Sequence, residues 1–288
     1  MATAAQLAQR RRLVATTAKR HPRKLPPVQQ PTGATLALTA PMLKIARDLD
    51  AAVNEALSQE GLDVLRTDAA DGDLPPIDRR ALLARLARLA DRLVKQRGTF
   101  LDDALAKVGD AVSAFSKAQW AKQAQAAMGV DLSAIEPDLA PTIKAFRQSH
   151  VDLIRTMTES KVERVRAILE DAGPGSRVET IRNRLMEDEG VSKRQAGLIA
   201  RDQVLKLNSA VTQKRHEAAG LTEYIWRTSG DASVRPEHRK LEGKRFRYDQ
   251  PPVVAKNGDR ARPGEYFQCR CTMEPVIEGF DEERAEGG

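Results

Sequence analysis

The residues best suited to chemistry lie near the end of the 288-residue sequence, in the stretch GEYFQCRCTMEP. This stretch holds both cysteines of the chain, Cys269 and Cys271, with only Arg270 between them. A disulfide between cysteines this close would be strained, so free thiols or metal ligands are expected instead. In an extended segment, residues two apart point to the same side, which would let both sulfurs approach one soft metal ion.

Two further residues would complete a set of metal ligands. Zinc is typically held by four nitrogen, sulfur or oxygen atoms in a tetrahedron. Asp231 and His238 precede the cysteines in the same region, so Asp231, His238, Cys269 and Cys271 form a hypothetical mixed zinc site. His216, at the end of the preceding helix, is a reserve ligand.

Two other interpretations of the cysteines remain open. They could be small buried residues beside a surface histidine. One of them could also be a thiolate nucleophile with His238 as its base, although no feature of the sequence selects one cysteine over the other.

A small β-containing region is needed to position these residues. The stretch TEYIWRTS, residues 222–229, alternates and is rich in aromatic and β-branched residues, which predicts a strand. Residues 265–277 predict a second extended segment, and the proline- and glycine-containing residues 251–264 between them predict a loop.

Helices are predicted immediately before this region. Residues 177–190 and 191–220 form two helical segments, the second closed by Gly220 as a C-cap. In the second helix we expect one set of inward-facing apolar side chains and one stripe of solvated polar side chains. The inward set is Leu198, Leu205 and Val211, and the polar stripe is Arg201, Asn208, Thr212 and Arg215.

The first 170 residues predict an aliphatic helical body without a catalytic constellation. Apolar residues recur at helical spacing over residues 38–65, 79–98, 99–129 and 142–173. Gly98 is expected to end the second of these helices, which carries Leu82, Leu86, Leu89 and Leu93 as its apolar stripe. Polar or proline-containing breaks are expected at residues 66–78 and 130–141, and the sequence GPGS at 173–176 marks a joint. His150 lies on the apolar face of the fourth helix, where a buried histidine is favoured over a metal ligand.

The net charge of +7 is located in the first 31 residues, which contain no acid. The rest of the chain carries 40 basic and 40 acidic residues. Such an arm could bind nucleic acid or an acidic partner surface, or it could simply be solvated. A mitochondrial presequence is less favoured because the prolines of HPRKLPPVQQP favour an extended arm. The basic residues of this arm are Arg10, Arg11, Arg12, Lys19, Arg20, Arg23 and Lys24.

No apolar run approaches the roughly 20 residues that a membrane crossing requires, and no signal-peptide core precedes the arm.

Over residues 177–278 the sequence resembles the phage Mu F-like head morphogenesis family, the minor capsid proteins of tailed phages. Several unrelated motif pieces agree in order and spacing. One departure is Asp202-Gln203, where many relatives have a threonine–glutamate pair. The matching positions are Ile199-Ala200-Arg201, Asn208, Gly220, Trp226, Thr228, Asp231, Arg235, His238, Gly243, Pro263-Gly264 and Cys269-Arg270-Cys271.

The resemblance implies an α+β protein with an elongated, mainly helical body and a small C-terminal β module, closed by zinc if the ligand hypothesis holds. The expected parts are a basic arm (1–35), a helical domain (36–172), the Mu F-like domain (177–278) and a tail (279–288).

The resemblance also implies a role in the phage head. The chain would be a minor head protein, made in the host cytoplasm and located inside the head or at the portal vertex. It would act in head assembly and in DNA packaging or ejection. The expected partners are the portal protein, packaged DNA and the major capsid protein, with no membrane and no catalytic activity. The alternatives are a metal-dependent nuclease that uses Asp231, Arg235 and His238, and a DNA-binding accessory protein.

Overall fold

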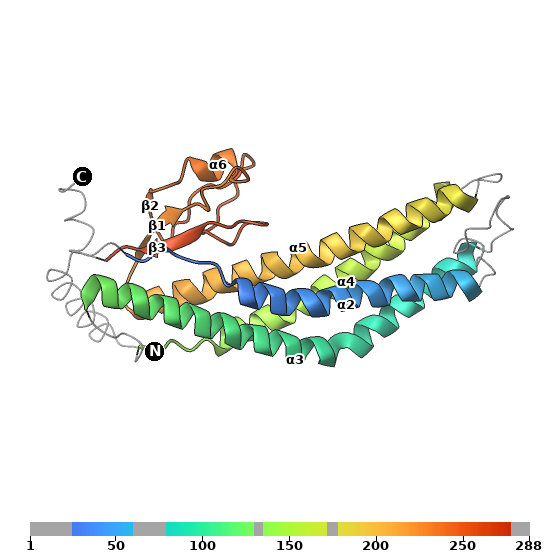
Figure 1. Cartoon of the computed structure of the whole chain (residues 1–288), viewed down its shortest axis with the longest axis horizontal. Coiled ribbons are helices and arrows are strands. Elements are labelled where there is room, and N and C mark those ends of the chain that lie inside the picture. Colours follow the sequence, from blue (N-terminus) through green and yellow to red (C-terminus); the bar gives the residue numbers. More distant parts are fainter. Residues whose placement is uncertain (1–24, 60–78, 130–134, 172–177, 278–288) are drawn as a thin grey trace. The chain divides into compact units, whose positions relative to one another are not determined.

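The computed structural model describes residues 25–59, 79–129, 135–171 and 178–277 (Figure 1). Several predicted segments therefore lie outside the described residues. These are the part of the arm that carries its seven basic residues, the loop at 66–78, the joint at 173–176 and the tail at 279–288.

The described residues before the sheet are mainly helical, as the sequence predicted. The helices are α2 (Thr32–Gln59), α3 (Arg79–Met128), α4 (Ala140–Asp171) and α5 (Val178–Ala218) (Figure 1). None of the helices in the described part of the chain combines the length and apolarity that a membrane crossing requires.

Two predicted helix boundaries are wrong. Gly98 does not end a helix, because α3 runs through it, and Gly190 does not separate two helices, because α5 is continuous across it. A single glycine inside a helix costs only about 1 kcal/mol relative to alanine. Packing along the rest of a long helix offsets such a cost, so a lone glycine is a weak stop signal.

Gly220 does end α5, as predicted. It adopts a φ of 85°, in the left-handed region that favours glycine. The backbone N–H of Gly220 donates to the Glu217 carbonyl, and the N–H of Leu221 donates to the His216 carbonyl, both at 2.9 Å. This pair of bonds is a Schellman motif, and it turns the chain out of α5 toward the first strand.

A three-stranded antiparallel sheet follows, which confirms the predicted β module. Strands β1 (Glu223–Arg227), β2 (Arg245–Arg247) and β3 (Thr272–Pro275) lie in the order β2-β1-β3. The short helix α6 (Pro236–Arg239) lies between β1 and β2 in the sequence. The predicted first strand is therefore the centre of the sheet. Only the end of the predicted second extended segment forms a strand.

The chain divides into two compact units, and each long helix contributes to both. The described residues of the second unit come from 36–107 and 145–200. Its buried residues include the apolar face of α2, and His150 on α4 is fully buried. The Nδ1 atom of His150 lies 2.7 Å from the Phe146 carbonyl oxygen, so the expectation of a buried, hydrogen-bonded histidine is confirmed. Leu198 is 43% exposed, so its predicted inward orientation is wrong.

The first unit contains the sheet together with residues 25–35, 108–144 and 201–220. One of its apolar clusters joins the ends of several elements and includes Leu25, Trp120, Leu221 and Ile277. A second apolar cluster lies within the β module and includes both cysteines.

The polar stripe predicted to be solvated on α5 is instead largely covered. Arg215 is only 1% exposed and Asn208 only 7%. The Arg215 guanidinium donates to the Ser113 hydroxyl at 3.0 Å and forms an ion pair with Glu136. The prediction failed because these partners lie 102 and 79 residues away in the sequence, where helical periodicity cannot detect them.

Candidate metal centre

The central strand β1 provides the foundation of the site. Its side chains alternate between half-buried and buried positions, and Tyr224 and Trp226 are fully buried. Trp226 pairs with Met273 of β3, so it lies beside the segment that carries the cysteines. The Trp226 indole also contacts the His238 imidazole edge to face, with ring centroids 5.4 Å apart. The aromatic residue that predicted a strand therefore also helps to fix the histidine.

Three of the four predicted ligands meet in the structure. His238 lies on α6, and Cys269 and Cys271 lie on the irregular segment immediately before β3. The histidine Nδ1 atom is 3.4 Å from the Cys269 Sγ and 3.5 Å from the Cys271 Sγ. The ligand atoms of the three residues all lie within 4.8 Å of one another, and all three side chains are buried.

These distances fit a metal centre. Zinc bonds of about 2.0 Å to nitrogen and 2.3 Å to sulfur place those two ligands about 3.6 Å apart in a tetrahedron. Both measured nitrogen–sulfur distances are close to that value. This buried group of one imidazole and two thiols could therefore hold a metal ion.

The two thiols influence each other's protonation. A hydrogen bond from the Cys271 thiol lowers the pKa of Cys269 to about 4, and hydrogen bonds from His238 and from the Gly264 N–H act in the same direction. Hydrogen bonding to Cys269, together with burial, raises the pKa of Cys271. The pair therefore favours one thiolate and one thiol, and a cation at this place would replace the remaining proton.

Asp231, the fourth predicted ligand, is not part of this group. It is exposed, and its Oδ1 accepts hydrogen bonds from the Arg270 guanidinium at 2.6 Å and from the Ser233 backbone N–H at 2.9 Å. The bond from Arg270 holds the pKa of this carboxyl below its usual value. Arg270 thus turns away from the cysteines on either side of it, and it binds the carboxylate that the sequence had suggested as a ligand.

His216, the reserve ligand, is also not part of the group formed by His238, Cys269 and Cys271. Its Nδ1 atom lies 2.5 Å from the Tyr248 hydroxyl, and its ring packs 5.0 Å from the Trp120 ring. Burial lowers the pKa of His216 to about 3, so it is neutral at physiological pH. Its role is in the packing between α3, α5 and the β module.

A tight turn that the sequence analysis missed holds Cys269 in place. Gln268 has a φ of 54°, which is unusual for a residue other than glycine. Its backbone N–H donates to the Asp202 carboxylate at 2.6 Å, and its side-chain Oε1 accepts from the Arg201 Nε at 2.8 Å. In the sequence, Arg201 was part of the family motif and of the predicted polar stripe, and Asp202 lay at the departure from the family pattern.

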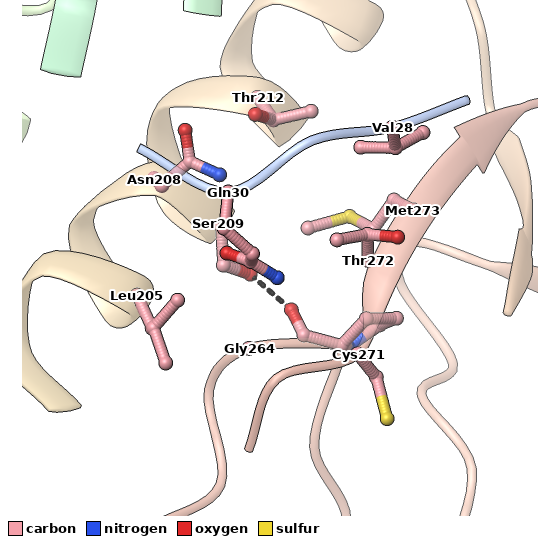
Figure 2. Close-up of a pocket in the computed structure, with 11 residues that line it drawn as sticks. Val28, Gln30, Leu205, Asn208, Ser209, Thr212, Gly264, Cys271, Thr272 and Met273 are labelled. Carbon is pink, nitrogen blue, oxygen red and sulfur yellow. Dashed lines mark hydrogen bonds between the residues drawn. The ribbon is translucent and has the colours of Figure 1, made fainter. Parts of the chain in front are cut away.

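A second support comes from Gly264, which also belongs to the predicted family motif. Its φ is 84°, and an added Cβ would lie 3.1 Å from the Ser209 Cβ. Ser209 in turn donates to the Pro263 carbonyl at 2.6 Å (Figure 2). Only glycine can approach α5 this closely while its N–H points at the Cys269 sulfur. Helix α5 therefore positions both turns that precede Cys269.

Comparison with known proteins finds a family that matches part of the chain. Residues 163–274 match the family described as Phage Mu protein F like protein. The match covers less than half of the chain. The matched region begins within α4 and includes all three residues of the buried group.

One curated relative is an uncharacterized protein from Haemophilus influenzae, which is 32% identical over 158 residues. The alignment covers 54% of this chain and 34% of that protein, so the chain matches about a third of the relative's length. No solved structure matches the chain.

Proposed function

We propose that the chain is a minor head protein of a tailed phage or prophage, located inside the head and associated with the portal. The observation that carries this proposal is the match to the Phage Mu protein F like family over residues 163–274. In this role the protein acts in head assembly and in DNA packaging or ejection. The basic arm would contact packaged DNA or an acidic surface of the portal protein.

The proposed role of the metal is structural, and the proposed ion is zinc. The apolar cluster of the β module has eight buried residues, and two of them are the cysteines. A bound metal ion would add substantially to the stability of a core this small, because structural zinc sites contribute on the order of 10 kcal/mol of binding energy to folding. His238 Nδ1 and the two sulfurs would hold the ion, and α6 would be tied to the segment before β3.

The burial of the group favours a structural role over a catalytic one. Cys269, Cys271 and His238 are 1%, 5% and 2% exposed, so a substrate has little access to them. The sulfurs are also almost equally far from the histidine Nδ1, so the distance to the imidazole does not distinguish one cysteine from the other. Asp231, which the nuclease alternative requires, is bound to Arg270 instead.

Metal content tests the zinc proposal directly. The protein would be purified in reducing buffer without chelators, as wild type and as Cys269→Ser, His238→Ala and Asp231→Ala variants. We expect about one zinc per chain in the wild type and in Asp231→Ala, and loss of zinc in the other two variants. Asp231→Ala is the matched control, because Asp231 faces Arg270. Absence of metal from the wild type would overturn the proposal.

The role in the head requires a separate test. A portal protein from the same phage or prophage would be co-expressed with the chain, and complex formation would be measured by size-exclusion chromatography with light scattering. A stable complex supports the proposal. If the chain forms no complex with the portal protein but cleaves DNA in a metal-dependent assay, the nuclease alternative would be established instead.

A further inference from the structure

A groove between α5 and β3 is crossed by a segment that lies far away in the sequence. The groove is lined by Leu205, Asn208, Ser209 and Thr212 from α5 and by Thr272 and Met273 from β3. Residues 25–31 lie along it in an extended form, and Val28 and Gln30 form part of its lining (Figure 2). Cys271 also lines the groove, but its sulfur points away from Val28 and Gln30 (Figure 2).

The crossing segment has the composition of a peptide ligand. Its sequence is LPPVQQP, in which three of seven residues are prolines. Proline has no backbone N–H and favours the extended polyproline conformation, so such a segment loses little entropy when it binds. Grooves that recognise proline-rich segments use this property.

Few polar contacts hold the segment in the groove. Gln30 Nε2 donates to the Arg270 carbonyl at 2.8 Å, and the Gln29 backbone N–H donates to the Gln119 side chain at 2.9 Å. The side-chain oxygens of Gln30 and Asn208 are both buried without a hydrogen-bond partner among the described residues. At the start of the segment, Leu25 packs in the apolar cluster that includes Trp120.

We propose that the α5–β3 groove is a binding site for an extended, proline-rich peptide, and that residues 25–31 occupy it as an exchangeable ligand in cis. The side chain of Gln30 is the specificity contact, because it reaches the backbone between the two cysteines. The basic arm continues directly from this ligand toward the N-terminus. Release of residues 25–31 would uncover the groove and would lengthen the segment that connects the basic arm to α2.

The test is a competition in trans with the full chain. A fluorescein-labelled peptide with the sequence of residues 25–34 would be titrated with wild-type, Gln30→Ala and Gln29→Ala chains, and its anisotropy would be followed. Gln29→Ala is the matched control, since Gln29 uses only its backbone N–H. Circular dichroism would establish that all three chains keep the same helix content and melting temperature.

The wild-type chain should bind the peptide weakly, because its own segment competes at a high effective concentration. The Gln30→Ala chain should bind it about five-fold more tightly, the change expected from loss of one hydrogen bond in the cis ligand. Gln29→Ala should behave as the wild type, and a peptide with alanine at the position of Gln30 should bind all chains more weakly. Absence of binding to the Gln30→Ala chain would overturn the proposal. Equal binding of both peptides to all chains would also overturn it, since that result indicates nonspecific association.

Discussion

The Asp202 carboxylate accepts a 2.6 Å hydrogen bond from the backbone N–H of Gln268, the residue immediately before Cys269. The carboxylate belongs to α5, and Gln268 belongs to a turn of the β module. This bond therefore helps to fix the position of a candidate metal ligand relative to the helix, together with the bond from Arg201 to the Gln268 side chain. It also supports Gln268 in its left-handed backbone conformation.

Asp202→Ala should therefore destabilise the first unit by about 1.5–3 kcal/mol, the range for hydrogen bonds to charged groups. Asp202→Asn should lose less, because its amide oxygen can still accept from Gln268. Urea denaturation followed by tryptophan fluorescence measures the change. Asp152→Ala, at an exposed position of α4, serves as the control and should leave stability within about 0.5 kcal/mol of the wild type. An Asp202→Ala protein as stable as the control would contradict this role.

Gly264→Ala should destabilise the chain more than Gly258→Ala. Both glycines have positive φ, so both substitutions introduce backbone strain of about 1 kcal/mol or more. At Gly264 the new Cβ would also lie 3.2 Å from the Leu205 carbonyl oxygen, whereas nothing lies within 4 Å at Gly258. The difference in melting temperature between the two variants measures the destabilisation that comes from the contact of the new Cβ with α5. Equal melting temperatures would show that the turn moves freely away from the helix.

Acidification should destabilise the protein through His150. Burial lowers the pKa of His150 to about 4 from an ordinary value of 6.5. The unfolded chain therefore binds a proton that the folded chain does not, and stability falls as the pH falls from about 6.5 to about 4. At about 1.4 kcal/mol per pH unit, the loss amounts to roughly 3 kcal/mol. His150→Leu should reduce the slope of this part of the pH profile in urea denaturation, while the contribution of the buried His216 remains. An unchanged slope would refute the assignment.

Lys161→Ala should be among the most destabilising substitutions in the second unit. The Lys161 ammonium is 3% exposed, lies 2.7 Å from Asp50 and also pairs with Asp188. Its removal leaves the buried Asp50 carboxylate without its cation, at a cost of about 3–5 kcal/mol, whereas Asp188 keeps its ion pair with Arg164. Lys44→Ala breaks a half-exposed pair with Asp48 and should cost less than about 1 kcal/mol. Similar melting temperatures for the two variants would contradict the prediction that the buried ion pairs of Lys161 contribute more to stability than the half-exposed pair of Lys44.

The sequence predicted those parts of the site that depend on local pattern. The alternation around Trp226 indicated the central strand, and Gly220 indicated the end of α5. The spacing of Cys269 and Cys271 indicated that both sulfurs could reach one point. Each of these features is determined by neighbouring residues, so each is visible without knowledge of the fold.

The parts that could not be predicted depend on partners distant in the sequence. Asp231 was as plausible a ligand as His238 by residue type, and only the path of the loop shows that Arg270 binds it. The burial of Arg215 requires Ser113 and Glu136 from other elements. The docking of Gln30 on Arg270 joins residues 240 positions apart. Propensity and periodicity carry no information about such pairs.

The strand order β2-β1-β3 also constrains how the module is made. Central strand β1 ends at Arg227, but its partner β3 begins only at Thr272, directly after the two cysteines. During synthesis, β1 must therefore remain without this partner until nearly fifty further residues have been added. The two sulfurs and the closing strand leave the ribosome almost together, so capture of a metal and closure of the sheet would coincide in time. If the pairing of β3 with β1 were delayed, the nascent chain would expose the edge of β1, and exposed strand edges promote aggregation.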